Sequence, residues 1–168
     1  GRACEYLTLC SGEDTPESLH LTRAPIDGLR RLLEASFDPR DGGFGQAPKF
    51  PHPTDLAFLL RRHIAAGDAR AKQMALTTLD HMAAGGIYDH LGGGFCRYSV
   101  DGQWVIPHFE KMLYDNAPLL ALYAEAAILT GAPRYRQVAE ETAAWVMREM
   151  QSPQGGYYSS LDADSEGE

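Results

Sequence analysis

The sequence predicts an all-α fold built from helical hairpins, with one small β-hairpin inserted between two of the helices. Two observations support this prediction. Five stretches carry apolar residues at the three- and four-residue spacing of an amphipathic helix. The connections between them alternate between a short link with one glycine and a long polar loop that contains Gly-Gly followed by an aromatic residue. Stacked helical hairpins produce this alternation, and a closed ring of them would place every long loop around one opening, here called the mouth.

The first three helices are expected at residues 25–37, 54–66 and 69–84. Pro25 suits the first turn of a helix, and Asp38 ends the first helix because a residue that precedes proline is disfavoured in the α region. Gly67 ends the second helix and Asp68 caps the third. The third helix ends at a pair of glycines, where the long central loop begins.

Residues 95–107 predict the inserted β-hairpin, because two β-prone runs flank an Asp-Gly pair. A two-residue turn would pair Val100 with Gln103 and Ser99 with Trp104. Strand alternation would then direct one set of side chains to the same face: Arg97, Ser99, Trp104 and Ile106, followed by His108.

The fourth helix is expected to start at residue 115 or 116 and to run to Thr130. An earlier start would put Pro118 in the helix interior, at a cost of about 3 kcal/mol. Residues 108–114 are therefore expected to form a separate turn. The fifth helix is expected at residues 133–150, followed by a third long loop.

Composition excludes several classes of function. The net charge is −8 and the pI is about 5.2, which argues against nucleic acid or an anionic membrane as the main partner. No apolar run approaches the roughly 20 residues that span a bilayer. Three sparse cysteines form neither a disulfide framework nor a zinc site, although Cys4 and Cys10 could pair with each other. A reducing, cytoplasmic location is expected, with no metal and no cofactor.

Aromatic and polar residues are densest between Gly85 and Asn116. Sugar recognition needs aromatic platforms together with side chains that hydrogen-bond hydroxyl groups. The expected substrate-binding residues are Arg97, Tyr98, Trp104, Tyr114, Asp115 and Asn116, with Phe44 and Phe95 as further platforms. The alternative is that the aromatic residues fill the core beneath the long loops and that Asp115 is a helix cap.

Four residues in the same segment are expected to be catalytic: His90, His108, Asp89 and Glu110. Two histidines could remove and return a proton next to a carbonyl group, as sugar epimerisation requires. Glycoside hydrolysis instead needs two carboxyl groups roughly 5–10 Å apart. Asp162 or Asp164 could approach from the next long loop. The alternative for each histidine is a structural hydrogen bond within its loop.

Residues 85–116 read GGIYDHLGGGFCRYSVDGQWVIPHFEKMLYDN, and they closely resemble the thioredoxin-domain-containing family of spermatogenesis-associated protein 20. The runs GGFGQAPKFPHP and SLDADSEGE resemble flanking motifs of that family. The resemblance implies a thioredoxin-like domain followed by an (α/α)6 toroid similar to N-acylglucosamine 2-epimerases and six-hairpin glycosidases. Residues 1–24 would be a linker or a remnant of the preceding domain. Residues 25–168 would be the first hairpins of the toroid, truncated at the C-terminus.

The resemblance implies a carbohydrate-active domain of epimerase, isomerase or glycosidase type, acting on a sugar-like small molecule. The family pattern favours histidine where this chain has Cys96 and glycine where it has Gln46. One alternative is a non-catalytic helical scaffold that works with the thioredoxin-like domain, and another is a thiol-based role for Cys96. Five helices of an expected twelve cannot close a ring, so we expect self-association through the open flank or a longer natural protein.

Overall fold

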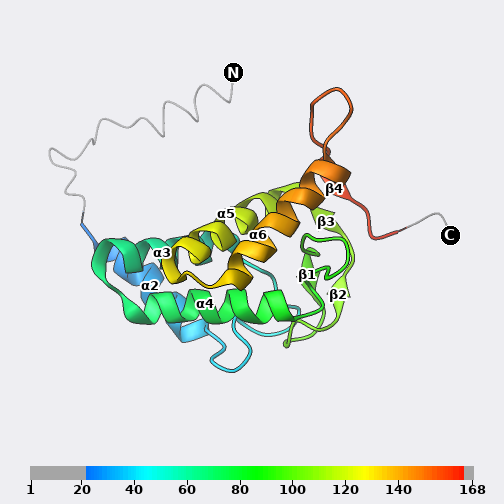
Figure 1. Cartoon of the computed structure of the whole chain (residues 1–168). Helices are drawn as coiled ribbons and strands as arrows, with labels where there is room; N and C mark the ends of the chain where they lie inside the picture. The colour runs from blue at the N-terminus through cyan, green and yellow to red at the C-terminus, as the bar shows by residue number, and fades with distance from the viewer. Residues whose placement is uncertain (1–21, 165–168) are drawn as a thin grey trace, which may run out of the picture.

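Five α-helices and a π-helical turn dominate the computed structural model, which describes residues 22–164. The helices are α2 (Ala24–Ser36), α3 (Pro53–Ala66), α4 (Ala69–Ala84), α5 (Leu113–Thr130) and α6 (Pro133–Trp145), and the π-turn η1 (Val146–Met150) follows α6. The prediction of successive helices is therefore confirmed, with the fifth one ending in a π-turn. Four two-residue strands gather at one end of the helices (Figure 1): β1 (Tyr98–Ser99), β2 (Pro107–His108), β3 (Lys111–Met112) and β4 (Ser160–Leu161).

Short glycine links join α3 to α4 and α5 to α6 into helical hairpins. Gly67 and Gly131 have positive φ angles of 68° and 70°, which a residue without a Cβ adopts readily, and the N–H of each returns to a carbonyl in the preceding helix. The two hairpins pack together where α3 contacts α5, while α2 lies against α4. Buried aliphatic and aromatic side chains between these helices form one continuous core.

Two of the long loops, 37–44 and 88–95, have the same structure. In each loop the first aromatic residue forms a β-bridge with the last one. The aspartate that follows, Asp38 or Asp89, accepts hydrogen bonds on Oδ1 from the N–H groups two and three residues later. The similar sequence patterns that end the first and third helices therefore reflect one repeated loop design.

A buried lysine holds the first of these loops in place. Lys49 is 1% exposed, and its Nζ lies 2.7 Å from Asp38 Oδ2 and 2.8 Å from the carbonyl oxygens of Gly42 and Gly102. The same ammonium group lies 5.5 Å from the centroid of the Trp104 ring. All three Lys49 donors are therefore satisfied.

The second loop is held by a lysine in the same way. Lys111 Nζ lies 2.7 Å from Asp89 Oδ2, 2.9 Å from the carbonyl oxygen of Gly93 and 5.0 Å from the centroid of the Trp145 ring. We call each of these arrangements, of lysine, aspartate, glycine carbonyl and tryptophan, a lysine clamp.

The inserted β-hairpin is present, but its predicted register is wrong. Tyr98 pairs with His108 and Ser99 with Pro107, so a seven-residue loop, residues 100–106, replaces the expected two-residue turn. The Asp101 carboxylate shapes this loop by accepting hydrogen bonds from the N–H groups of residues 103, 105 and 106. Trp104 adopts a positive φ of 68° and its ring is fully buried instead of lying on the hairpin face.

The predicted start of the fourth helix is also wrong. The helix α5 begins at Leu113, so Pro118 lies inside it and not in its first turn. The preceding residues do not form a separate turn, because β3 pairs in antiparallel register with β4 and continues directly into α5. None of the described helices is both long enough and apolar enough to cross a membrane.

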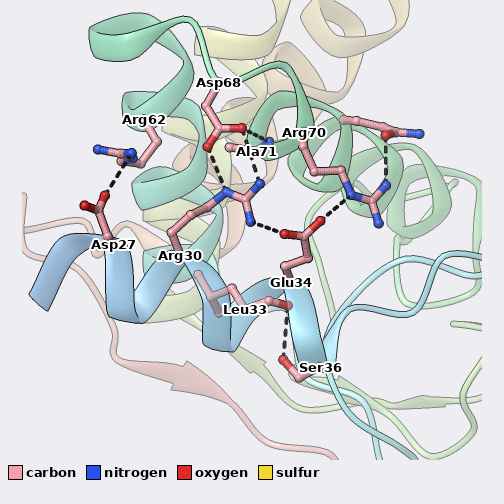
Figure 2. Close-up of polar contacts among 10 residues, drawn as sticks. Asp27, Arg30, Leu33, Glu34, Ser36, Arg62, Asp68, Arg70 and Ala71 are labelled. Atoms are coloured by element: carbon pink, nitrogen blue, oxygen red, sulfur yellow. Dashed lines mark hydrogen bonds and ion pairs between the residues drawn. The ribbon is translucent and has the colours of Figure 1, made fainter. Parts of the chain in front are cut away.

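A network of ion pairs attaches α2 to the hairpin of α3 and α4 (Figure 2). At its centre, Arg30 Nε lies 2.8 Å from Asp68 Oδ2 and Arg30 Nη1 lies 2.9 Å from Glu34 Oε2. Asp68 also caps α4 by accepting the N–H of Ala71, which confirms the predicted cap. Two further pairs flank this centre: Asp27 with Arg62, and Glu34 with Arg70.

Replacing Lys49 with methionine should destabilise the fold strongly. The variant leaves the Asp38 carboxylate and two carbonyl groups without their cation, so we expect the free energy of unfolding to fall by about 3 kcal/mol. The control is Lys72→Met, at a partly exposed residue of α4, which should change stability by less than about 0.5 kcal/mol. Urea denaturation of both variants measures the difference. Equal losses of stability in the two variants would contradict the stabilising role of Lys49 in the clamp.

Candidate functional site

A hollow of about 310 Å³ lies where the first turns of α3 and α5 meet. It is lined by Phe50, Pro51, His52, Pro53, Thr54, Tyr114, Asp115 and Pro118. Both helices begin directly after a long loop that includes a clamp lysine. The hollow therefore lies at the predicted mouth.

Asp115 is the most perturbed acid at this hollow. Burial raises its pKa to about 6, Arg97 acts in the opposite direction, and Glu110 adds to the rise. Asp115 Oδ2 is buried and has no hydrogen-bond partner among the described residues. The carboxyl group is therefore partly protonated near neutral pH, and one of its oxygens is unpaired.

Arg97 and Glu110 form an ion pair beside Asp115. Arg97 Nη1 lies 2.9 Å from Glu110 Oε2, and the Arg97 N–H donates to the Glu110 carbonyl oxygen at 2.7 Å. The Arg97 pKa is raised, first by its hydrogen bond to Glu110 and also by the charges of Tyr114 and Asp115. The structure thus brings together four residues that were predicted as separate candidates: Arg97, Glu110, Tyr114 and Asp115.

Stacked rings extend from the hollow into the β-hairpin. The ring centroids of Phe50 and Tyr98 are 4.8 Å apart, and those of Tyr98 and His108 are 4.7 Å apart. The His108 Nδ1 atom is buried and has no hydrogen-bond partner within residues 22–164. His108 does not line the hollow itself, but its ring is connected through Tyr98 to Phe50, which does.

Asp89 and His90 do not join this group. Burial acts to raise the pKa of Asp89, but hydrogen bonds from the Gly92 N–H and from Lys111 lower it to about 2. His90 Nε2 lies 2.9 Å from the Gly85 carbonyl oxygen. His90 lines a different hollow, together with Glu141 and Arg148. The four residues predicted as catalytic are thus divided between two places, and Asp89 belongs to a lysine clamp.

Two residues predicted to bind substrate are buried and have structural partners. Trp104 is fully buried and its Nε1 donates to the Asp41 carbonyl oxygen at 2.8 Å. Asn116 is also fully buried, and its amide accepts the N–H of Phe95 and donates to the carbonyl oxygens of Phe95 and Met112. Phe44 and Phe95 lie in the core as well, so the core interpretation holds for these aromatic residues.

Cys96 lacks the features of a reactive thiol. It is 4% exposed, and burial raises the pKa of its thiol. Cys4 and Cys10 lie outside the described residues. Residues 22–164 contain no group of three or more His, Cys, Asp or Glu side chains that could hold a metal ion.

The segment Phe50–Thr54 is the part of the hollow that sequence reasoning missed. It lies outside the densest aromatic run of the sequence. The available signal was its place in the chain, because this segment enters α3 at the same end of the helices at which Tyr114 and Asp115 enter α5.

Solved structures of sugar-modifying enzymes share this architecture. Cellobiose 2-epimerase from Spirochaeta thermophila gives a TM-score of 0.68 at 20% identity, over 89% of this chain and 42% of that one. D-mannose isomerase gives 0.70 at 14% identity, over 90% and 41% of the two chains. A family 76 glycoside hydrolase from a bovine Bacteroides thetaiotaomicron strain gives 0.59 at 20% identity, over 68% and 24%. The chain therefore has the fold of part of an (α/α)6 toroid.

The sequence comparison is more specific, although no family model matches the chain. Spermatogenesis-associated protein 20 of Homo sapiens is 49% identical over 137 residues, which cover 79% of this chain and 17% of the relative. An uncharacterized protein of Caenorhabditis elegans is 45% identical over 98% of this chain and 23% of the relative. The chain belongs to the spermatogenesis-associated protein 20 family, and it spans about a fifth of the length of these relatives.

Replacing Asp115 with asparagine should stabilise the protein at neutral pH. The raised pKa means that wild-type Asp115 supports the fold when protonated, below about pH 4, and that this support is lost as the pH rises through about 6. The asparagine variant avoids that loss, so we expect a gain of about 1 kcal/mol at pH 7.5, reduced for partial exposure, and none at pH 4. Urea denaturation across this pH range measures it, with Asp162→Asn as the exposed control. A gain in stability that does not change with pH would contradict the raised pKa of Asp115.

Proposed function

We propose that this chain supplies part of a sugar-binding active site, located at the hollow between the first turns of α3 and α5. The observation that carries the proposal is the pair of unpartnered buried atoms, Asp115 Oδ2 and His108 Nδ1, in a region that contains aromatic surfaces and an ion pair. Buried polar atoms are normally hydrogen-bonded, so an unpaired oxygen in the lining of the hollow and an unpaired nitrogen in the ring stack that leads from it are suited to a ligand. The sugar epimerase, isomerase and hydrolase neighbours support this reading.

The proposed reaction is proton transfer at a carbon next to a sugar carbonyl group. His108 acts as the base through Nδ1, and the protonated form of Asp115 donates to the carbonyl oxygen. The ion pair of Arg97 and Glu110 orients the hydroxyl groups, and the half-exposed Tyr114 ring offers an apolar face to the sugar. The rest of the site comes from other parts of the longer protein, for which we also propose a thioredoxin-like domain.

Glycoside hydrolysis is the second candidate, and one observation favours it. Glu110 contributes to the raised pKa of Asp115, so Asp115 can hold a proton beside a second carboxyl group, which is paired with Arg97. A protonated carboxyl group with a second carboxyl group nearby is the arrangement that acid-base hydrolysis uses.

The test compares proton exchange with hydrolysis. The full-length protein that contains this chain is incubated with reducing sugars in deuterated water, and NMR follows deuterium at C2. A parallel assay follows the cleavage of aryl glycosides. We expect exchange at C2, with Asp115→Asn and His108→Gln each lowering its rate by about 10²-fold or more.

The controls are Glu140→Gln and His81→Gln, which replace a carboxylate and a histidine that belong neither to the hollow nor to the stacked rings beside it. Both should retain the wild-type rate. Cleavage of the aryl glycosides without deuterium exchange at C2 would favour glycoside hydrolysis over the proposed proton transfer. Sugar binding without either reaction would support a non-catalytic scaffold, and an absence of sugar binding would overturn the proposal.

A further inference from the structure

A third loop repeats the design of the two clamped loops. In residues 151–157, Gln151 forms a β-bridge with Tyr157, as the aromatic ends of the earlier loops do. Ser152 takes the place of the aspartate, and its Oγ accepts the N–H of Gly156 at 3.1 Å. The Ser152 N–H donates to the Gly156 carbonyl oxygen at 2.8 Å, as the aspartate N–H donates to a glycine carbonyl in the other loops.

The strand register assigns the third loop to the same series. Ser99 follows Phe95 by four positions and pairs with Lys49, the clamp lysine of the preceding loop. Leu161 follows Tyr157 by four positions and pairs with Lys111 in the same way. Tyr157 is therefore the structural counterpart of Phe95.

The third loop differs from the others in what covers it. Phe44 and Phe95 are 8% and 0% exposed, whereas Tyr157 is 53% exposed. Phe95 is covered by Tyr123 of α5, the helix that follows its loop, with ring centroids 5.2 Å apart. The aromatic residue that ends the third loop lacks an equivalent cover among residues 22–164.

Glycine contacts show the same difference. A Cβ at Gly43 would lie 2.6 Å from the Trp104 ring, and one at Gly94 would lie 2.7 Å from the Trp145 ring. Gly156 has only Ser152 Oγ nearby, at 3.6 Å. Each of the first two loops is therefore packed against a tryptophan that comes later in the chain, whereas residues 22–164 place no tryptophan at that position of the third loop.

We propose that the face of the third loop bearing Tyr157 and Tyr158 is a docking surface for the next helical hairpin of the longer polypeptide, which supplies an aromatic side chain and an apolar helix face. The chain already forms the tryptophan contact twice, at Gly43 and Gly94, and the cover by a following helix once, at Phe95. The relatives and the toroid enzymes are long enough to provide it, since this chain spans 17% of the human relative and 41% of D-mannose isomerase. The proposal is independent of the proposed function.

The flank of α5 and α6 fits the same occupant. A hollow of about 380 Å³ there is lined by apolar side chains, three of them alanines, together with Arg136 and Glu140. Ile128, which also lines it, is 88% exposed. A second helix packed over this flank would cover Ile128 as α5 covers Phe95.

The test measures how accessible position 157 is. Tyr157→Cys is made in a background with Cys4 and Cys10 replaced by serine, and it carries a polarity-sensitive fluorophore. The 168-residue chain is compared with the chain extended by the sequence that follows it in its gene. We expect the extension to shift the emission to the blue and to reduce iodide quenching several-fold. The control label is at Leu91, a fully exposed tip residue of the second loop, and it should respond equally in both proteins.

Unfolding provides a second readout that needs no label. Tyr157→Ser should lower the midpoint of thermal unfolding of the extended protein and leave that of the 168-residue chain unchanged, whereas Phe95→Ser should lower both. Equal quenching at position 157 in the two proteins would overturn the proposal, as would a gene that encodes no further hairpin. Protection of position 157 that grows with the concentration of the 168-residue chain would identify a second copy as the occupant, and would also overturn it.

Discussion

The buried ammonium group of each lysine clamp is the interaction on which the mouth depends. An ammonium ion removed from water is costly unless its donors are paired, and Lys49 meets this condition with one carboxylate and two backbone carbonyl groups. Each clamp closes an irregular loop that has almost no ladder hydrogen bonds of its own. Lys49 lies four residues before α3 and Lys111 two residues before α5, so each clamp anchors the segment that leads into one of these helices. The hollow between the two first turns is a consequence of that placement.

The same residue type serves opposite purposes near the two ends of the segment that joins α4 to α5. Asp89 receives hydrogen bonds from backbone N–H groups and from a lysine, and its pKa is about 2. Asp115 is buried with one oxygen unpaired, and its pKa is about 6. Environment therefore separates a permanently charged structural carboxylate from one that can carry a proton near neutral pH. Neither role can be assigned from the sequence position alone.

The parts of the fold that could be predicted are those set by local rules. Apolar spacing located the helices, Gly67 and Asp68 marked the turn between α3 and α4, and the Gly-Gly-aromatic pattern indicated the repeated loops. The hairpin register could not be predicted, because the Asp101 carboxylate replaces a backbone partner and lengthens the turn. Pro118 was misplaced because the continuation of β3 into α5, and not the best position for proline, sets the start of that helix.

The part of the site that could be predicted is likewise the part that local sequence rules place. Arg97, Glu110, Tyr114 and Asp115 are close in sequence and come together through the short strands before α5. His90 is equally close in sequence, but the lysine clamp closes its loop on itself and directs that loop elsewhere. Trp104 was predicted to be a binding platform because the sequence does not show whether an aromatic side chain is exposed or buried. Only the position of Lys49 and Gly43 beneath its ring distinguishes the two.

The repeated loop design also bears on how such a protein can diversify. In loops 37–44 and 88–95 the framework is the aspartate, the two glycines and the closing phenylalanine, and the three tip residues differ completely: Pro39, Arg40 and Asp41 in one, His90, Leu91 and Gly92 in the other. Tip side chains contribute nothing to the clamp, which uses backbone atoms and the aspartate there. Selection can therefore alter the chemistry at the two exposed tip positions of each loop, 39–40 and 90–91, at little cost to folding, whereas a Cβ at Gly92 would lie 2.8 Å from Asp89 Oδ2.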